Sequence, residues 1–150
     1  MLWRALLAFL ALPGIFAIAI PAMLAANGLR SGGRFHVAGL LPLVAGFGLL
    51  LWCVREFYVI GKGTLAPWAP PTHLVTSGPY RHSRNPMYVA VSTMLIGWAL
   101  SFESRSIAWF TGIMILAYYL RVVWGEEPWL AQKHGAAWEE YKARVPRWLL

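Results

Sequence analysis

Long apolar runs separated by short polar segments make up most of the chain. Residues 5–26 and 36–60 form the first two runs, and residues 87–102 and 107–124 form two shorter ones. A helix needs about 20 apolar residues to cross the hydrocarbon core of a bilayer, so run 87–102 reaches across only with help from its flanks. The pattern predicts an all-α, polytopic membrane protein with about four transmembrane helices.

The first run has an alternative interpretation as a cleaved signal peptide. Arg4 precedes it, and small residues occur at 22–26. The apolar core of a signal peptide is about 7 to 15 residues long, which is shorter than this run. A retained span is therefore the favoured interpretation.

The polar segments between the runs predict a loop and a hairpin. Residues 61–86 are rich in Pro, Gly, Ser and Thr, and they are too polar and too broken to span. Residues 103–106 form a tight connection, so we expect the third and fourth spans to pack as a helical hairpin.

The second run contains residues with expected packing roles. Arg55 and Glu56 should face an interface or the interior of the bundle. Small residues let helix backbones approach closely, and the run contains three of them: Gly39, Gly46 and Gly48.

A C-terminal amphipathic segment, residues 126–145, follows the last run. It places apolar residues at mostly helical spacing, with charges between them, and these are Trp129, Leu130, Trp138, Tyr141 and Val145. We expect it to begin after Gly125, to lie on or near the membrane surface, to break at Gly135 and to end at Pro146. The chain then reads as a single integral-membrane domain, 1–150.

The composition supports a membrane protein and argues against several other classes of protein. Hydrophobic residues make up 59% of the chain and charged residues 13%, which leaves too little polar surface for a soluble domain of this size. The net charge of +7 comes from scattered residues rather than a basic block, so we expect no nucleic-acid partner. Cys53 stands alone, and no His, Cys or Asp spacing indicates a metal site.

The basic residues also predict an orientation. Four spans put both termini and the 61–86 loop on one side of the membrane. That side would carry Arg4, Arg55, Lys62, Arg81, Arg84, Arg121, Lys133, Lys142, Arg144 and Arg147, and the other only Arg30, Arg34 and Arg105. By the positive-inside rule, we expect the first side, with the active site, to be cytoplasmic.

Two polar clusters on that side are candidates for chemistry. One is the run His73–Tyr88, and the other follows the fourth span with Arg121, Glu126 and Glu127. Because the predicted hairpin brings their ends together, we expect one site at membrane level, where a small ligand could bind.

These two segments carry a resemblance to a known family. The run HLVTSGPYRHSRNPMY, followed about 40 residues later by EEPWLAQKHGAAWEEYKARVPRW, resembles the integral-membrane methyltransferases. That family includes isoprenylcysteine carboxyl methyltransferase and the phospholipid N-methyltransferases. The resemblance implies S-adenosylmethionine as cofactor, wrapped by the loop and the acidic segment, and a lipophilic acceptor that enters from the bilayer.

The resemblance also implies which residues act. The cofactor contacts would come from His73, Leu74, Val75, Gly78, Tyr80, Arg84, Asn85, Tyr88, Glu126 and Glu127. Arg121 and Glu127 would be catalytic. Where the family often has Arg-His-Pro, this chain has Arg84-Asn85-Pro86, and Asn keeps a hydrogen-bond donor and an acceptor but cannot ionise.

The same residues suit the cofactor on chemical grounds. S-adenosylmethionine presents an ammonium, a sulfonium, a carboxylate and an adenine. Glu126 or Glu127 can take the ammonium or the ribose hydroxyls, and tyrosines can face the sulfonium or the adenine. Arg84, His73 and backbone amides near Gly78 can take the carboxylate.

Several functions stay open at this point. The candidate acceptors are a prenylcysteine-type carboxylate, a phospholipid amine and a small thiol. An NADPH-dependent membrane reductase of the sterol-reductase kind is an alternative, because residues 133–146 resemble its C-terminal pattern. A non-catalytic membrane scaffold is the third hypothesis.

Overall fold

The regular structure of the protein is helical throughout the described residues. A computed structural model describes residues 10–30, 34–62 and 72–149, and these ranges contain no strand. The elements in order are η1 (Leu10–Ala19), α2 (Ile20–Arg30), η2 (Val37–Gly39), α3 (Leu40–Val59), η3 (Gly78–Arg81), α4 (Pro86–Phe102), α5 (Arg105–Arg121), η4 (Val122–Glu126), α6 (Glu127–His134) and α7 (Ala136–Arg144). The all-α prediction is confirmed.

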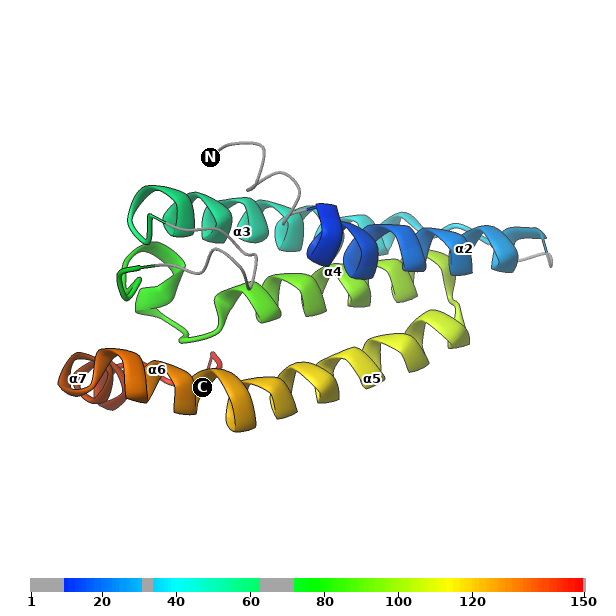
Figure 1. Cartoon of the computed structure of the whole chain (residues 1–150). Helices are drawn as coiled ribbons and strands as arrows, with labels where there is room; N and C mark the ends of the chain where they lie inside the picture. The colour runs from blue at the N-terminus through cyan, green and yellow to red at the C-terminus, as the bar shows by residue number, and fades with distance from the viewer. Residues whose placement is uncertain (1–9, 31–33, 63–71, 150) are drawn as a thin grey trace.

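The long helices lie side by side, with α4 at the centre. Helices α2 and α3 cover one side of α4, and α5 lies along the other (Figure 1). Helices α6 and α7 continue from α5 to the end of the bundle where η3 lies. The loop and the C-terminal helices, which are far apart in sequence, therefore meet at one end.

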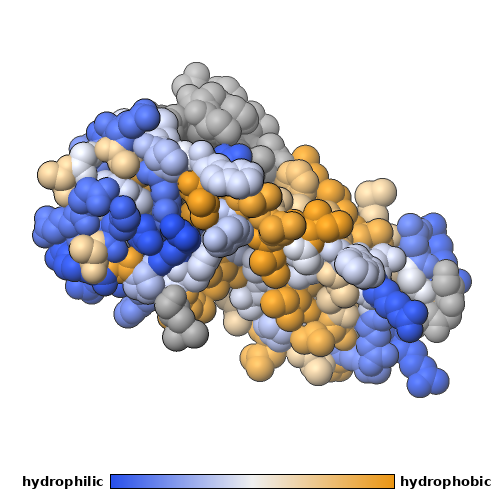
Figure 2. All heavy atoms as spheres, turned by 90° about the horizontal axis from the view of Figure 1, so that it is seen from below, coloured by the Kyte–Doolittle hydropathy of each residue, from blue (hydrophilic) through white to orange (hydrophobic). Residues whose placement is uncertain are grey.

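Within the described residues, three helical stretches are long and apolar enough to cross a membrane: Pro13–Arg30, Val37–Val59 and Arg105–His134. Helix α4 is apolar but shorter, as expected from run 87–102. Figure 2 shows hydrophobic residues around the middle of the molecule and hydrophilic residues at its two ends. This distribution suits a bundle that crosses the bilayer along its long axis.

Two helices extend beyond the apolar runs of the sequence. The first helix continues to Arg30 rather than ending at residue 26, and its predicted start lies outside the described residues. The helix of the fourth span does not stop before Gly125 but continues through the π-helical η4 into α6. A glycine weakens a helix by only about 1 kcal/mol, and the wider π turn accommodates Pro128, which has no backbone N–H to donate.

Close backbone packing joins α3 to α4. A Cβ added at Gly46 would lie 2.7 Å from the Ala90 carbonyl oxygen, and one at Gly97 would lie 2.7 Å from the Leu43 nitrogen. A Cβ added at Gly39, just before α3, would lie closer still to the Gly97 carbonyl oxygen and to Ser101. The prediction for Gly39 and Gly46 is confirmed, whereas Gly48 was wrong, because no atom lies within 4 Å of its added Cβ.

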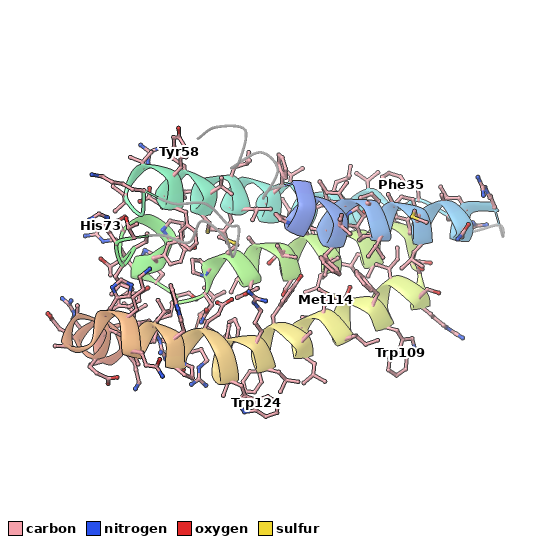
Figure 3. The ribbon with its side chains drawn as sticks, in the orientation of Figure 1. Phe35, Tyr58, His73, Trp109, Met114 and Trp124 are labelled. Atoms are coloured by element: carbon pink, nitrogen blue, oxygen red, sulfur yellow. The ribbon has the colours of Figure 1, made fainter. Side chains whose placement is uncertain are left out.

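The predicted hairpin between α4 and α5 is present and tight. Helix α4 ends at Phe102, Glu103 takes a left-handed conformation with φ of 44°, and α5 starts at Arg105. The Ser104 hydroxyl caps α5 by accepting a hydrogen bond from the Ile107 amide at 3.3 Å. Met114 of α5 points toward α4 and packs on its core, whereas Trp109 of α5 and Trp124 of η4 point away from the bundle (Figure 3).

Candidate active site

The loop before α4 docks on the last two turns of α3. The Tyr80 ring stacks on Phe57 with centroids 5.4 Å apart, and Val75 and Tyr80 together bury Cys53. Burial raises the pKa of Tyr80 well above its ordinary value, so its phenol stays protonated. Gly78 has φ of +55°, and a Cβ there would lie 2.9 Å from the Trp52 indole nitrogen.

A buried carboxylate fastens this loop to α3. Glu56 is only 5% exposed, and it accepts a hydrogen bond from the Ser77 hydroxyl at 2.5 Å and one from Arg55 at 2.9 Å. The interior position predicted for Glu56 is confirmed, whereas Arg55 is exposed. The sequence did not identify Ser77, although an acidic residue in an apolar helix is itself a signal that a partner exists.

The Tyr88 cluster, which consists of Tyr88, Arg121 and Glu126, joins α4 to the end of α5. The Tyr88 hydroxyl donates to Glu126 Oε1. Arg121 Nε donates to the same Glu126 oxygen at 2.8 Å and to the Tyr88 hydroxyl at 3.0 Å. Glu126 remains 34% exposed, so a ligand can reach it.

The Glu127 cluster, which consists of Arg84, Glu127 and Arg147, is more enclosed. Glu127 Oε1 accepts from Arg84 at 2.8 Å and from Arg147 at 2.9 Å, and Oε2 accepts a second bond from Arg147 at 2.9 Å. Hydrogen bonding to Glu127 raises the pKa of Arg147. Glu127 is thus held by two guanidinium groups.

Helix α7 packs against the loop and helps to enclose the Glu127 cluster. Trp138, Tyr141 and Val145 are buried, and the half-buried Leu74 packs against them. The Tyr141 hydroxyl donates to the Tyr80 carbonyl oxygen at 2.7 Å, and burial raises the pKa of Tyr141. The Arg84 guanidinium lies 5.5 Å from the centre of the Trp138 ring.

Two cavities flank the start of α4. The first, of about 360 Å³, is a groove between α4 and α5 that begins at Tyr88 and reaches Ile96 and Ile115. The second, of about 250 Å³, lies between α3, the loop and α4 and includes Trp52 and His82 in its wall. Val89 lines both, and both walls are mostly apolar.

Most of the residues predicted for the site lie at this end of the bundle, in several distinct places. Arg84 contacts Glu127, and Tyr88 contacts Glu126 and Arg121, across 43, 38 and 33 positions of sequence. Leu74, Val75, Gly78 and Tyr80 shape the docked loop.

Two further predicted residues, Asn85 and His73, belong neither to the two clusters nor to the packed part of the loop. Asn85 donates from its side chain to the Arg147 carbonyl oxygen at 3.1 Å, so it ties α4 to the C-terminal segment. His73 is exposed, and its ring interacts with Thr72 next to it (Figure 3).

The comparison with known families decides the class of the protein. The model of the family described as phospholipid methyltransferase matches residues 35–137, which is more than half of the chain. The chain belongs to the phospholipid methyltransferase family. No curated protein and no solved structure shows significant similarity to it.

Family membership gives the fold its functional meaning. A member of this family in which three of the described helical stretches are apolar and of spanning length is an integral membrane protein and a methyltransferase. The match begins before α3 and ends within α7, so it includes the hairpin, the loop, the Tyr88 cluster, and Arg84 and Glu127 of the Glu127 cluster, but not Arg147.

Proposed function

We propose that the protein transfers a methyl group from S-adenosylmethionine to the amine of a lipophilic acceptor. One observation carries the proposal: the apolar groove between α4 and α5 ends at Tyr88, whose hydroxyl is bonded to Glu126 and Arg121. A lipid tail suits the apolar walls, and its polar head would then lie against the Tyr88 cluster.

The loop and the Glu127 cluster fit the proposed cofactor. Two buried polar atoms there have no oxygen or nitrogen partner among the described residues, namely the Tyr80 hydroxyl and Arg84 Nε. The group beside the Tyr80 hydroxyl is the Cys53 thiol, a weak hydrogen-bonding group. Arg84 Nε suits the cofactor carboxylate, and the Tyr80 hydroxyl can donate to a ligand acceptor.

When bound, S-adenosylmethionine supplies an electrophilic methyl group. The acceptor nitrogen forms a bond to the methyl carbon, and the carbon–sulfur bond breaks with its electron pair going to sulfur. An ammonium must first lose a proton, and the acid–base group of the proposal is Glu126, which accepts a hydrogen bond from the groove-lining Tyr88. Tyr88 and Arg121 orient Glu126, and the apolar walls exclude water from the reacting atoms.

The aromatic lining of the groove favours an amine over a carboxylate or a thiol. Three tyrosines, Tyr88, Tyr118 and Tyr119, line its polar end together with Trp148. Aromatic faces attract ammonium cations, most strongly where water is excluded. A carboxylate acceptor would instead gain from an arginine without a carboxylate partner, and Arg121 is already bonded to Glu126.

Ligand binding to the detergent-purified protein tests the cofactor. We expect S-adenosylmethionine to bind in isothermal calorimetry and NADPH not to bind. Arg84→Ala should weaken binding of the methyl donor roughly 10-fold or more, as for a lost charge-assisted hydrogen bond. Arg144→Ala is the control, because Arg144 pairs with Glu140 on the exposed face of α7.

Transfer of labelled methyl groups to phosphatidylethanolamine in mixed micelles tests the acceptor. The proposal predicts incorporation into this lipid in preference to a prenylcysteine carboxylate or a free thiol. A folded preparation that binds only NADPH, or that methylates only the carboxylate, contradicts it.

A further inference from the structure

Residues 145–149, here called the strap, cross the site between the two cavities. Trp148 lines the groove between α4 and α5, and the next residue, Leu149, lines the cavity between α3 and α4. Two neighbouring residues therefore face different cavities. The side chain at position 148 is half-buried.

Backbone and side-chain hydrogen bonds fix the strap just before Trp148. The Arg84 amide donates to the Pro146 carbonyl oxygen at 2.9 Å. The Arg147 carbonyl oxygen accepts from the Ser83 hydroxyl at 3.2 Å and from the Asn85 amide group at 3.1 Å. The Arg147 guanidinium adds its two bonds to Glu127. The position of Trp148 is thus set by the start of α4 and by α6.

Trp148 lies at the polar end of the groove, next to the group that would receive the methyl. It shares this end with Tyr88, Tyr118 and Tyr119, while the aliphatic residues Ile96 and Ile115 line the groove farther along α4 and α5. The Tyr88 and Tyr118 rings pack with centroids 4.7 Å apart. The indole therefore adds a large π face where an acceptor head would lie, not where its tail would lie.

We propose that Trp148 is a specificity-determining residue that distinguishes the methylation states of the acceptor amine; this inference rests on the proposed function. A primary ammonium has three N–H groups and can bond to Glu126 and to the Tyr88 hydroxyl. A dimethylated ammonium has one N–H group and two methyl groups, so it depends more on aromatic faces. Trp148 therefore contributes most to binding of the dimethylated acceptor.

Kinetics with three acceptors tests the proposal: phosphatidylethanolamine and its N-monomethyl and N,N-dimethyl derivatives, in mixed micelles. We expect Trp148→Leu to raise KM for the dimethyl acceptor roughly 5- to 30-fold, from the typical strength of a desolvated cation–π contact. KM for the primary amine should change less than threefold, and kcat should change little for either acceptor. Trp148→Phe, which keeps an aromatic face, should restore most of the lost affinity.

The controls distinguish a specificity role of Trp148 from a purely structural one. They also distinguish failure of this inference from failure of the proposed function. Leu149→Ala changes the neighbouring cavity and should leave the three KM values unchanged. Calorimetric binding of S-adenosylmethionine shows that each variant is folded, and Trp148→Met replaces the leucine variant if that one fails. Equal loss for all three acceptors, or equal behaviour of the Phe and aliphatic variants, overturns the inference. A wild-type protein that methylates none of the three overturns the proposed function instead.

Discussion

The two neighbouring acids Glu126 and Glu127 have different surroundings and therefore different expected roles. Glu127 is 13% exposed and bonded by two arginines, whereas Glu126 is 34% exposed and bonded by Tyr88 and Arg121. A carboxylate that must accept a proton needs access to the reacting group, and Glu126 has it. Glu127 instead joins Arg84 to the strap, although the resemblance assigned it a catalytic role.

Substitution of the two acids by glutamine separates these roles. Glu126→Gln should lower kcat for an amine acceptor by roughly 10² to 10⁴, the usual contribution of a general base, with little change in Tm. Glu127→Gln should lower the free energy of unfolding by about 1–3 kcal/mol, because two guanidinium groups lose their charged partner. Initial rates and thermal unfolding in detergent measure both effects. A large loss of kcat at Glu127 with no loss at Glu126 would reverse the assignment.

The buried Glu56 has a consequence for stability. Glu56→Ala removes the acceptor of the Ser77 hydroxyl at a buried site, so we expect the free energy of unfolding to fall by about 1–3 kcal/mol. Glu56→Gln keeps an acceptor oxygen and should be less destabilising. Intrinsic tryptophan fluorescence during denaturation measures both, with the exposed Glu140→Ala as the matched control. Equal effects of Glu56→Ala and Glu140→Ala would show that the loop does not depend on this contact.

The sequence predicts the site residues that the hairpin brings together, but not the roles of Ser77 and Arg147, which lie in irregular segments. Tyr88 and Arg121 lie at the two open ends of one hairpin, so their proximity follows from the span pattern alone. Ser77 and Arg147 reach their partners because irregular backbone turns toward α3 and α4, and no periodicity describes such a turn. For the same reason the exposed position of His73 could not be read from its motif.

At the scale of elements, the sequence predicts apolar helices well and glycine behaviour poorly. Gly135 was correctly expected to break the C-terminal helix, whereas Gly125 lies inside a continuous one. The difference is conformational: Gly135 has φ of +51°, and Gly125 lies in the π-helical turn and has no positive φ. The sequence shows the same residue in both cases, and only the surrounding contacts determine whether a glycine ends a helix or lies within it.

This difference predicts opposite results for two alanine substitutions. Gly135→Ala should lower Tm, because an L-residue is strained at this positive φ and helix α7 would be displaced from the loop. Gly125→Ala should leave Tm unchanged or raise it slightly, since alanine favours a helix by about 1 kcal/mol and no atom lies within 4 Å of its Cβ. Thermal unfolding of the two variants in one detergent compares them directly. A lower Tm for Gly125→Ala alone would contradict the continuous helix.

Packing between α3 and α4 supplies a second matched pair. Gly46→Ala places a methyl group 2.7 Å from the Ala90 carbonyl oxygen and 2.8 Å from Met94, so the helices must separate and the protein should lose about 1–3 kcal/mol of stability. Gly48→Ala, on the open face of the same helix, should be neutral. Chemical denaturation of both variants measures the difference. Equal stability would mean that α3 and α4 do not pack through Gly46.

At the scale of the whole molecule, the fold separates two polar ends by an apolar middle (Figure 2). The loop, α6 and α7 share one end, and the α4–α5 connection lies at the other (Figure 1). Most of the basic residues belong to the first end, so the charge asymmetry of the sequence coincides with the end that holds the site. The orientation of this end in the membrane is a prediction with a direct test.

Single cysteines in intact cells test that orientation. Cys53 is buried and can be replaced by Ala, after which Glu140→Cys marks the site end and Ser106→Cys marks the opposite end, both at exposed positions. We expect a membrane-impermeant maleimide to label Ser106→Cys in intact cells and Glu140→Cys only after permeabilisation. A basic flank is retained on the cytoplasmic side during insertion. Replacing several basic residues of the site end should therefore reduce the difference in labelling between the two cysteines. Labelling of Glu140→Cys in intact cells would place the methyl-transfer site on the outer side, where S-adenosylmethionine made in the cytoplasm could not reach it directly.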